Sequence, residues 1–346
     1  MRVIGYQQPG SIDREDALID IELPTPKPAG RDILVEVKAI SVNPVDTKVR
    51  KSAPPDAGNW KVLGWDAAGI VTAAGPDATL FRPGDEVFYA GAIGRPGTNS
   101  EYHLVDERIV GNKPRTLDWA EAAALPLTAI TAWEALFDRL DVRKLVPGAA
   151  PAIIIIGGAG GVGSVAIQLA RALTELTVIA TASRPETVAW VREMGAHHVV
   201  DHAKPLAAQV AALGLGAPAF VFSTTQTARH LEQIAELISP QGRFALIDDP
   251  PALDANLFKR KSASVHWEFM FTRSAYGTAD IGEQGKLLGE VSRLADAGTL
   301  RTTLTERLSP INAGNLKRVH ALIESGTARG KIVLEGFGTG GKGNAE

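Results

Sequence analysis

The sequence predicts an α/β protein in which a doubly wound parallel sheet accompanies a second, β-rich domain. From Pro151 onward, apolar runs of strand length alternate with helical runs, the order of a parallel sheet with crossover helices. The first third instead has short alternating segments separated by turns rich in glycine and proline. A length of 346 residues also suits about two domains.

The β-rich part begins with a clear strand pattern. Residues Asp32–Ile40 alternate apolar and polar side chains, as expected of a half-buried strand. The composition changes at Trp119, where an alanine- and leucine-rich segment predicts two helices with Pro126 between them. The first third therefore predicts a barrel-like or sandwich-like domain that ends near this point.

The rest of the chain predicts alternating elements. Predicted strands are Ile153–Ile156, Thr177–Ala182, His198–Asp201, Ala219–Ser223, Phe244–Ile247 and Lys331–Leu334. Predicted helices are Val162–Leu173, Pro185–Met194, Ala228–Ile238, Gln284–Ala297 and Asn315–Glu324. The period-two aromatic residues Trp267, Phe269 and Phe271 predict one buried face of a strand.

Composition excludes several classes of protein. A net charge of −3 gives no general attraction to nucleic acid or to an anionic membrane. The absence of cysteine excludes disulfides, thiolate-bound zinc, iron–sulfur clusters and a catalytic thiol. No segment predicts a membrane span or a signal peptide, so a soluble cytoplasmic protein is expected.

One motif predicts nucleotide binding. The segment IIIIGGAGGVGSVAIQLAR places Gly158, Gly160 and Gly163 in the spacing G-x-G-x-x-G, after a strand and at the start of a helix. The glycines would allow a tight turn and close approach of a pyrophosphate to the helix N-terminus. The alternative is a plain glycine-rich turn between two elements.

The next predicted strand indicates which dinucleotide would bind. It ends in Ser183 and Arg184, and the first carboxylate beyond it is Glu186. NAD binders place an acidic residue there for the ribose 2′-hydroxyl, whereas a hydroxyl and a guanidinium suit a 2′-phosphate. The pattern therefore predicts NADP(H). The alternative is that Ser183 and Arg184 only cap the helix that begins at Pro185.

The segments around the motif resemble the medium-chain dehydrogenase/reductase superfamily over nearly the whole chain. The matching segments are VKAISVNPVDTKVR, LGWDAAGIV, FRPGDEVF, LPLTAITAWEAL, MGAHHVVDH, HWEFMFTRS and ESGTARGKIVLEGF. The subgroup most similar to them contains quinone oxidoreductase-related, "zinc-type alcohol dehydrogenase-like" reductases. This resemblance implies a GroES-like catalytic domain from residues 1–126 and 272–346, and a Rossmann NADP-binding domain from residues 127–271.

The resemblance also implies a set of cofactor contacts. Those expected to bind the cofactor are Asn43, Thr128, Gly158, Ala159, Gly160, Gly161, Val162, Gly163, Ser183, Arg184, His202, Thr224, Ile247, Phe271 and Lys331. Asp248 and Asp249 depart from the small or polar residues expected beside Ile247. Trp267, Phe269 and Phe271 would approach a homodimer contact. We favour this interpretation over a buried strand face and over an apolar acceptor pocket lined by the same residues and Trp65.

The zinc ligands of alcohol dehydrogenases are missing from the sequence. Their catalytic cysteine would fall near Ser41–Asn43, and their Gly-His-Glu segment is matched by Gly64-Trp65-Asp66. Tetrahedral zinc needs three or four convergent ligands, so no metal is expected. Without a Lewis acid, hydride transfer from NADPH to a quinone or an α,β-unsaturated carbonyl is the reaction we expect. The catalytic candidates are Asn43 and Thr47 as donors to the developing oxyanion, with Asp46 and Tyr89.

Two other functions stay open from the sequence. One is a zinc-type alcohol dehydrogenase acting on an alcohol or aldehyde, and the other is a crystallin-like or RNA-binding relative without turnover. A short-chain dehydrogenase is disfavoured because none of the four tyrosines is followed by lysine four residues on. The expected partners are a small-molecule carbonyl or quinone and a second copy of the chain.

Overall fold

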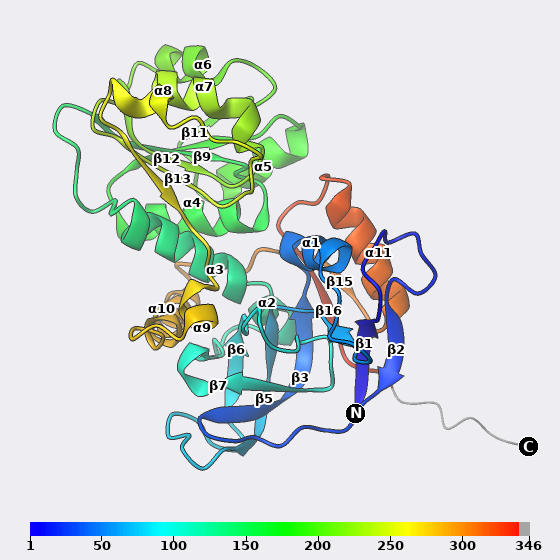
Figure 1. Cartoon of the computed structure of the whole chain (residues 1–346). Coiled ribbons are helices and arrows are strands. Elements are labelled where there is room, and N and C mark those ends of the chain that lie inside the picture. Colours follow the sequence, from blue (N-terminus) through cyan, green and yellow to red (C-terminus); the bar gives the residue numbers. More distant parts are fainter. Residues whose placement is uncertain (339–346) are drawn as a thin grey trace, which may run out of the picture. The chain divides into compact units, whose positions relative to one another are not determined.

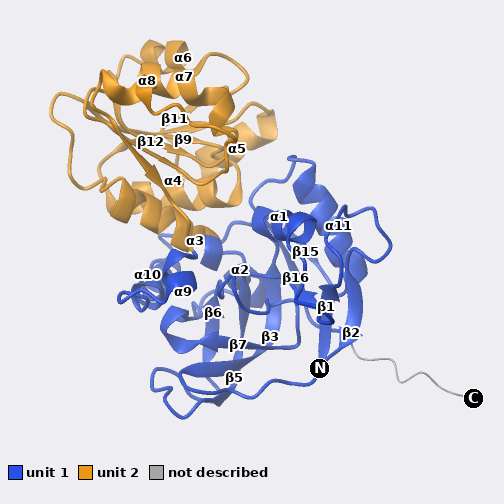
Figure 2. Cartoon of the chain, viewed as in Figure 1, with its two compact units in different colours: residues 1–127, 271–346 blue, residues 128–270 orange. Residues whose placement is uncertain are grey.

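The chain forms two compact units in a computed structural model that describes residues 1–338. Unit 1 combines Met1–Leu127 with the chain from Phe271 onward, and unit 2 is Thr128–Met270 (Figure 2). Unit 1 is therefore built from two segments that are far apart in the sequence, and unit 2 is the continuous segment between them.

Unit 2 contains one parallel sheet of six strands, in the order β11-β10-β9-β12-β13-β14. Ile179, Ile154, Val221 and Phe244 lie side by side on four neighbouring strands and are all buried in the core. Both faces of such a sheet are covered, which explains the nearly continuous apolar runs in the sequence. The strands are β9 (Ala150–Ile156), β10 (Thr177–Thr181), β11 (His198–Val200), β12 (Pro218–Ser223), β13 (Arg243–Leu246) and β14 (Ser264–Trp267).

Helices follow the strands of unit 2 and lie on both faces of its sheet (Figure 1). They are α4 (Gly161–Leu173), α5 (Pro185–Glu193), α6 (Leu206–Ala212), α7 (Thr227–Leu237) and α8 (Asn256–Lys259). Helix α3 (Pro126–Trp133) begins at the proline that the sequence places between two helices, and it continues as a π-helical turn, η2 (Glu134–Arg139). Proline suits a first helical position because its missing N–H would have no partner there.

Unit 1 is β-rich. Its larger sheet has the order β15-β16-β3-β5-β6-β8, with β7 also paired to β3, and a smaller sheet has the order β2-β1-β4. Its strands are β1 (Arg2–Tyr6), β2 (Ile19–Glu22), β3 (Asp32–Ser41), β4 (Lys61–Val62), β5 (Ala67–Ala74), β6 (Glu86–Tyr89), β7 (Tyr102–Asp106), β8 (Gly111–Asn112), β15 (Leu304–Leu308) and β16 (Lys331–Glu335). Its helices are α1 (Pro44–Ser52), η1 (Glu107–Ile109), α2 (Trp119–Ala123), α9 (Thr272–Tyr276), α10 (Glu283–Asp296) and α11 (Ala313–Glu324).

The predicted fold class is confirmed, since the chain contains a doubly wound parallel sheet and a separate β-rich unit. The buried strand face at 267–271, which is the alternative to the favoured homodimer contact, is wrong. Strand β14 ends at Trp267, and Trp267 and Phe269 are 52% and 49% exposed whereas Phe271 is 2% exposed. The backbone leaves the sheet after Trp267, so spacing by two no longer places side chains on one face. Within residues 1–338, no helix combines the length and hydrophobicity needed to cross a bilayer.

Candidate active site

The glycine motif forms the turn between β9 and α4. An added Cβ on Gly163 would lie 2.3 Å from the carbonyl oxygen of Gly157, so no side chain fits there. Gly160 is the N-cap of α4, and it offers no side chain to the first N–H groups of the helix. Those groups and the helix dipole favour an anion at this turn. The six predicted residues from Gly158 to Gly163 are therefore together at one potential anion-binding turn.

Two threonines brace this turn from neighbouring strands. Gly157 N–H donates to Thr181 Oγ1 at 3.0 Å, and Thr224 Oγ1 donates to the carbonyl oxygen of Ile156 at 2.9 Å. The hydroxyl proton of Thr224 is thus used within the protein, although its oxygen can still accept. Ile247 follows β13 and donates its N–H to the carbonyl oxygen of Ser223 at 3.3 Å. These residues lie at the carboxyl ends of their strands, where ligands bind in doubly wound sheets.

A basic cluster follows the end of β10. Ser183 Oγ lies 3.1 Å from His202 Nε2, which brings together two residues that are distant in the sequence. Burial, and then the positive charges of Arg229 and Arg184, lower the pKa of His202, against an opposing effect of Asp201. Arg184 also pairs with Glu186 at 3.3 Å, on the half-exposed surface of the cluster. Sequence reasoning missed Arg229, because it lies in the first turn of α7 and belongs to no recognisable motif.

Asp248 has a structural role that explains its departure from the expected residue type. The backbone N–H of Thr227 donates to Asp248 Oδ2 at 2.8 Å, and the Thr227 hydroxyl donates to Asp248 Oδ1. The N-cap residue of α7, Gln226, is in the left-handed region and makes no side-chain cap. Asp248 therefore caps α7 from the neighbouring strand end.

In unit 1, Asn43, Asp66 and Lys331 form a buried polar cluster with Ser41. Asp66 Oδ2 accepts from Ser41 Oγ at 2.8 Å, from Asn43 Nδ2 at 2.7 Å and from Lys331 Nζ at 3.1 Å. Its Oδ1 accepts from the backbone N–H of Leu127 at 2.7 Å. Ser41 ends β3, Asn43 is the N-cap of α1, Asp66 directly precedes β5, and Lys331 begins β16. The structure thus groups the predicted residues Asn43 and Lys331.

Asp46 and Thr47, the other two catalytic candidates close to Asn43, lie in the first turn of α1. Asp46 Oδ2 accepts from the backbone N–H of Asn43 at 2.7 Å, and Asp46 Oδ1 is buried with no partner within the described chain. Burial raises the pKa of Asp46 to about 7, although the Asn43 N–H and Lys331 oppose this effect. The hydroxyl of Thr47 donates to the carbonyl oxygen of Pro44 at 2.9 Å, so a contact with a substrate oxyanion would require its proton to turn away.

Tyr89 stacks on His103, with ring centroids 5.5 Å apart, and its hydroxyl lies 3.2 Å from His103 Nδ1. The other ring nitrogen lies 2.9 Å from the carbonyl oxygen of Pro96, which can only accept. Burial lowers the pKa of His103 to about 4, so the ring is neutral at pH 7 and its Nδ1 must accept. The Tyr89 proton is therefore donated to His103 and would have to leave it to reach a substrate.

The aromatic residues Trp65 and Phe271 are both buried in unit 1. Their rings pack edge to face with centroids 6.0 Å apart, and Trp65 Nε1 donates to the carbonyl oxygen of Ala92 at 3.3 Å. Thr128, another predicted contact, is buried in α3. The contact with Trp65 gives Phe271 a packing role inside unit 1.

The residues of this chain do not fit a zinc ion. Within residues 1–338 there is no group of three His, Cys, Asp or Glu side chains able to hold a metal. Asp66, which the sequence matches to a zinc ligand, is instead bonded to the ammonium of Lys331 at 3.1 Å. A zinc ion on this carboxylate would lie beside a buried positive charge.

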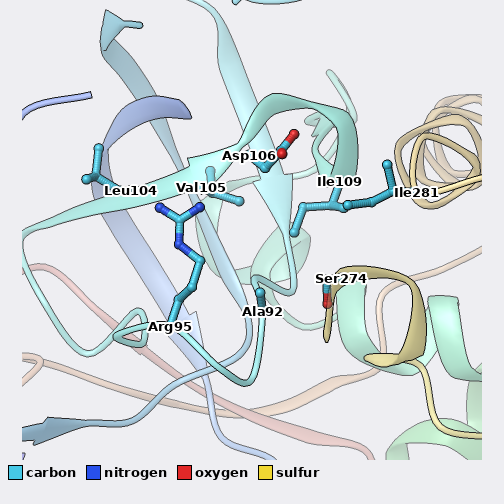
Figure 3. A pocket seen from close by; sticks show the side chains of 8 residues that line it. All are labelled: Ala92, Arg95, Leu104, Val105, Asp106, Ile109, Ser274 and Ile281. Carbon is cyan, nitrogen blue, oxygen red and sulfur yellow. The ribbon is translucent and has the colours of Figure 1, made fainter. Parts of the chain in front are cut away.

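A separate cavity of about 80 Å³ lies in unit 1 (Figure 3). Its two charged side chains are already paired, Arg95 with Asp32 at 2.8 Å and Asp106 with Arg108 at 2.7 Å. Binding sites for drug-sized ligands are usually ~300–1,000 Å³. This cavity is therefore too small for a dinucleotide or a quinone, and it contains none of the predicted site residues.

Comparisons with known proteins agree with this architecture. The family model "Alcohol dehydrogenase GroES-like domain" matches residues 29–115, and "Zinc-binding dehydrogenase" matches residues 194–334. A zinc-type alcohol dehydrogenase-like protein of Staphylococcus aureus (strain MSSA476) is 39% identical, covering 96% of this chain and 99% of the relative. The 2-methylene-furan-3-one reductase of Solanum lycopersicum is 34% identical over 59% of this chain and 53% of its own.

A solved structure is more similar still. A protein from Rhizobium etli CFN 42, given provisionally as a zinc-dependent alcohol dehydrogenase, has 73% identity and a TM-score of 0.97, covering 98% of this chain and 99% of its own. The resemblance seen in the sequence is confirmed by these relatives. The chain belongs to the medium-chain dehydrogenase/reductase superfamily, among the zinc-type alcohol dehydrogenase-like proteins, and is an oxidoreductase.

Proposed function

We propose that this oxidoreductase is a zinc-independent, NADPH-dependent reductase of quinones or α,β-unsaturated carbonyl compounds. The observation that carries the proposal is the basic cluster beyond β10. Ser183 contacts His202 there, the charges of Arg229 and Arg184 lower the pKa of His202, and the carboxylate that would select a free 2′-hydroxyl is missing from the strand end. A 2′-phosphate is the ligand chemistry that suits this arrangement.

The residues of unit 2 would hold the cofactor. The turn from Gly158 to Gly163 fits a pyrophosphate at the N-terminus of α4, and Ser183, Arg184 and Arg229 suit the 2′-phosphate. Thr128, His202, Thr224 and Ile247 remain proposed contacts, as do Asn43 and Phe271 from unit 1. When bound, the reduced nicotinamide supplies the hydride.

The residues of unit 1 would stabilise the charge that hydride transfer creates on the acceptor. One hydrogen of the Asn43 amide donates to Asp66, and the second has no acceptor within residues 1–338, so it can donate to an oxyanion. Asp46 holds the Asn43 backbone, and its unpartnered oxygen can carry a proton at neutral pH. Thr47 and Tyr89 are further candidate donors once their present bonds open.

The acceptor class follows from the donor set. A lone amide hydrogen polarises a simple ketone less than a metal ion does, whereas a quinone or enone spreads the incoming charge over a conjugated system. The tomato relative, named as a 2-methylene-furan-3-one reductase, supports an enone of this kind. The second candidate is zinc-dependent alcohol oxidation, the activity ascribed to the Rhizobium relative. A crystallin-like or RNA-binding role without turnover is the third.

The test is an NADPH-consumption screen with quinones, enones, aldehydes and alcohols, with and without a chelator. We expect turnover with conjugated acceptors that is the same in both conditions, and a lower KM for NADPH than for NADH. Chelator-sensitive alcohol oxidation would replace the proposal with the second candidate. No turnover with any acceptor would favour the third. We further propose that the protein is cytoplasmic and forms a homodimer. Sedimentation of the purified chain would test the homodimer.

A further inference from the structure

Lys331 is almost fully buried, and every hydrogen of its ammonium has an acceptor inside the protein. Nζ donates to the carbonyl oxygen of Val42 at 3.1 Å, to Asp66 Oδ2 at 3.1 Å and to Asn43 Oδ1. An ammonium has three donors and no acceptor, so this set is complete. Lys331 has no hydrogen left for a cofactor or a substrate, which contrasts with the cofactor contact that the sequence suggests.

The same bonds fix the orientation of the Asn43 amide. Its oxygen must face the ammonium, because an ammonium only donates, and its nitrogen must face the carboxylate of Asp66, because an ionised carboxylate only accepts. A flip of the amide would place its NH2 group against the ammonium, donor to donor, and its oxygen against the carboxylate, acceptor to acceptor. The remaining Nδ2 hydrogen of Asn43 is therefore held in one direction.

The charge of the cluster is balanced without a metal. Asp66 is fully buried, and a buried carboxylate needs a paired positive charge together with hydrogen bonds. Lys331 supplies the charge, while Ser41, Asn43 and Leu127 supply the bonds. A divalent ion at Asp66 would have to displace the ammonium or lie beside it.

We propose that Lys331 is a built-in cation that takes the charge-balancing place of a metal at Asp66. As a positioning residue, it fixes the Asn43 amide and keeps divalent ions out of the cluster. This explains how a chain matched by a zinc-binding family model works without zinc ligands. Only its effect on turnover depends on the proposed reductase function.

The experiment compares four forms of the full-length chain: wild type, Lys331→Met, Asp66→Asn and the double variant. Lys286→Met is the matched control, because Lys286 is an exposed lysine of α10 whose ammonium pairs with Glu283 on the surface. Melting temperature is measured for all of them. Zinc content is measured by mass spectrometry after dialysis against zinc chloride and then buffer. kcat and KM are measured with NADPH and a quinone.

We expect wild type and Lys286→Met to retain less than ~0.1 zinc per chain, far below the one ion of a specific structural or catalytic site. Lys331→Met leaves Asp66 unpaired and should melt roughly 10 °C lower. The double variant removes both charges and should regain at least half of that loss. This recovery distinguishes charge balance from lost packing, since the methionine is present in both variants.

The kinetic arm tests positioning. In the double variant we expect kcat to fall at least ~10-fold, which corresponds to one misdirected hydrogen bond, while KM for NADPH changes less than ~3-fold. Stoichiometric zinc in wild type, an unchanged melting temperature in Lys331→Met, or unchanged kcat in the double variant would each overturn the proposal. If wild type reduces no acceptor, the proposed function fails, and the zinc and melting results still decide the role of Lys331.

Discussion

Two alanine substitutions in the glycine turn should have opposite consequences. In Gly163→Ala, the new Cβ would lie 2.3 Å from the Gly157 oxygen and 2.7 Å from Gly158 Cα. Both neighbours are backbone atoms that cannot rotate away, so we expect a cost of about 3 kcal/mol, the upper end of the overpacking range. At ~2–4 °C per kcal/mol, the melting temperature of this unit should fall by about 6–12 °C.

Gly160→Ala should instead preserve the fold and weaken NADPH binding. Its new Cβ would meet only the Gly157 oxygen, at 3.5 Å, and the residue has an ordinary φ of −72°. We expect a melting temperature within about 3 °C of wild type, since losing glycine at an N-cap costs only a few tenths of a kcal/mol to ~1 kcal/mol. The methyl group points into open space where the pyrophosphate would approach, so NADPH affinity should fall at least ~10-fold.

The assay combines thermal melts without cofactor and titration of NADPH fluorescence. Gly289→Ala is the control, because it is inside helix α10 and, within residues 1–338, no atom beyond its chain neighbours and the adjacent helix backbone lies within 4 Å of its added Cβ. It should melt at or slightly above the wild-type temperature. If Gly163→Ala melts with wild type, the close packing of the turn is refuted. If Gly160→Ala binds NADPH as wild type does, the pyrophosphate does not lie at this turn.

Three further predictions concern charge and hydrogen bonding. Arg184→Ala and Arg229→Ala should each raise KM for NADPH roughly 10-fold and leave KM for NADH unchanged, because each removes one charge-assisted bond to the 2′-phosphate; equal losses for both cofactors would refute this. Burial and then Glu134 raise the pKa of Glu268 to about 9, so its stabilising contribution is lost as pH rises toward 9. In urea unfolding, the free energy of unfolding of Glu268→Gln minus that of wild type should therefore be ~1–3 kcal/mol larger at pH 8.5 than at pH 5. An equal difference at the two pH values would contradict this prediction. Tyr89→Phe should cost ~1–3 kcal/mol in stability by leaving His103 Nδ1 without its donor, with kcat within ~3-fold of wild type; a larger loss of kcat would make Tyr89 a catalytic donor.

Sequence patterns revealed those parts of the fold whose signals are local. The isoleucine run of β9 and the glycines after it are contiguous, so strand, turn and helix could be read together. Helix α6 was missed because Leu206–Ala212 spans only seven residues and has no capping motif. The aromatic spacing at 267–271 misled because it continues beyond the end of β14.

The candidate site was less predictable because its contacts join distant residues. Lys331 and Asp66 are 265 positions apart, and no local pattern shows that an ammonium covers that carboxylate. Asp248 caps a helix that begins 21 residues earlier, which explains an acidic residue where a small one was expected. The family resemblance indicated which residues matter, whereas the direction of each hydrogen bond required the structure.

The split construction of unit 1 has a consequence for how the chain folds during synthesis. Strand β16 pairs with β3 through Val333 and Ser41, so this contact cannot form until synthesis has passed residue 333. Unit 2 is continuous and needs no later segment for its sheet, whereas residues 39–41 at the end of β3 lack their β16 partner until then. Lys331 begins the same late strand, so Asp66 gains its positive partner only then.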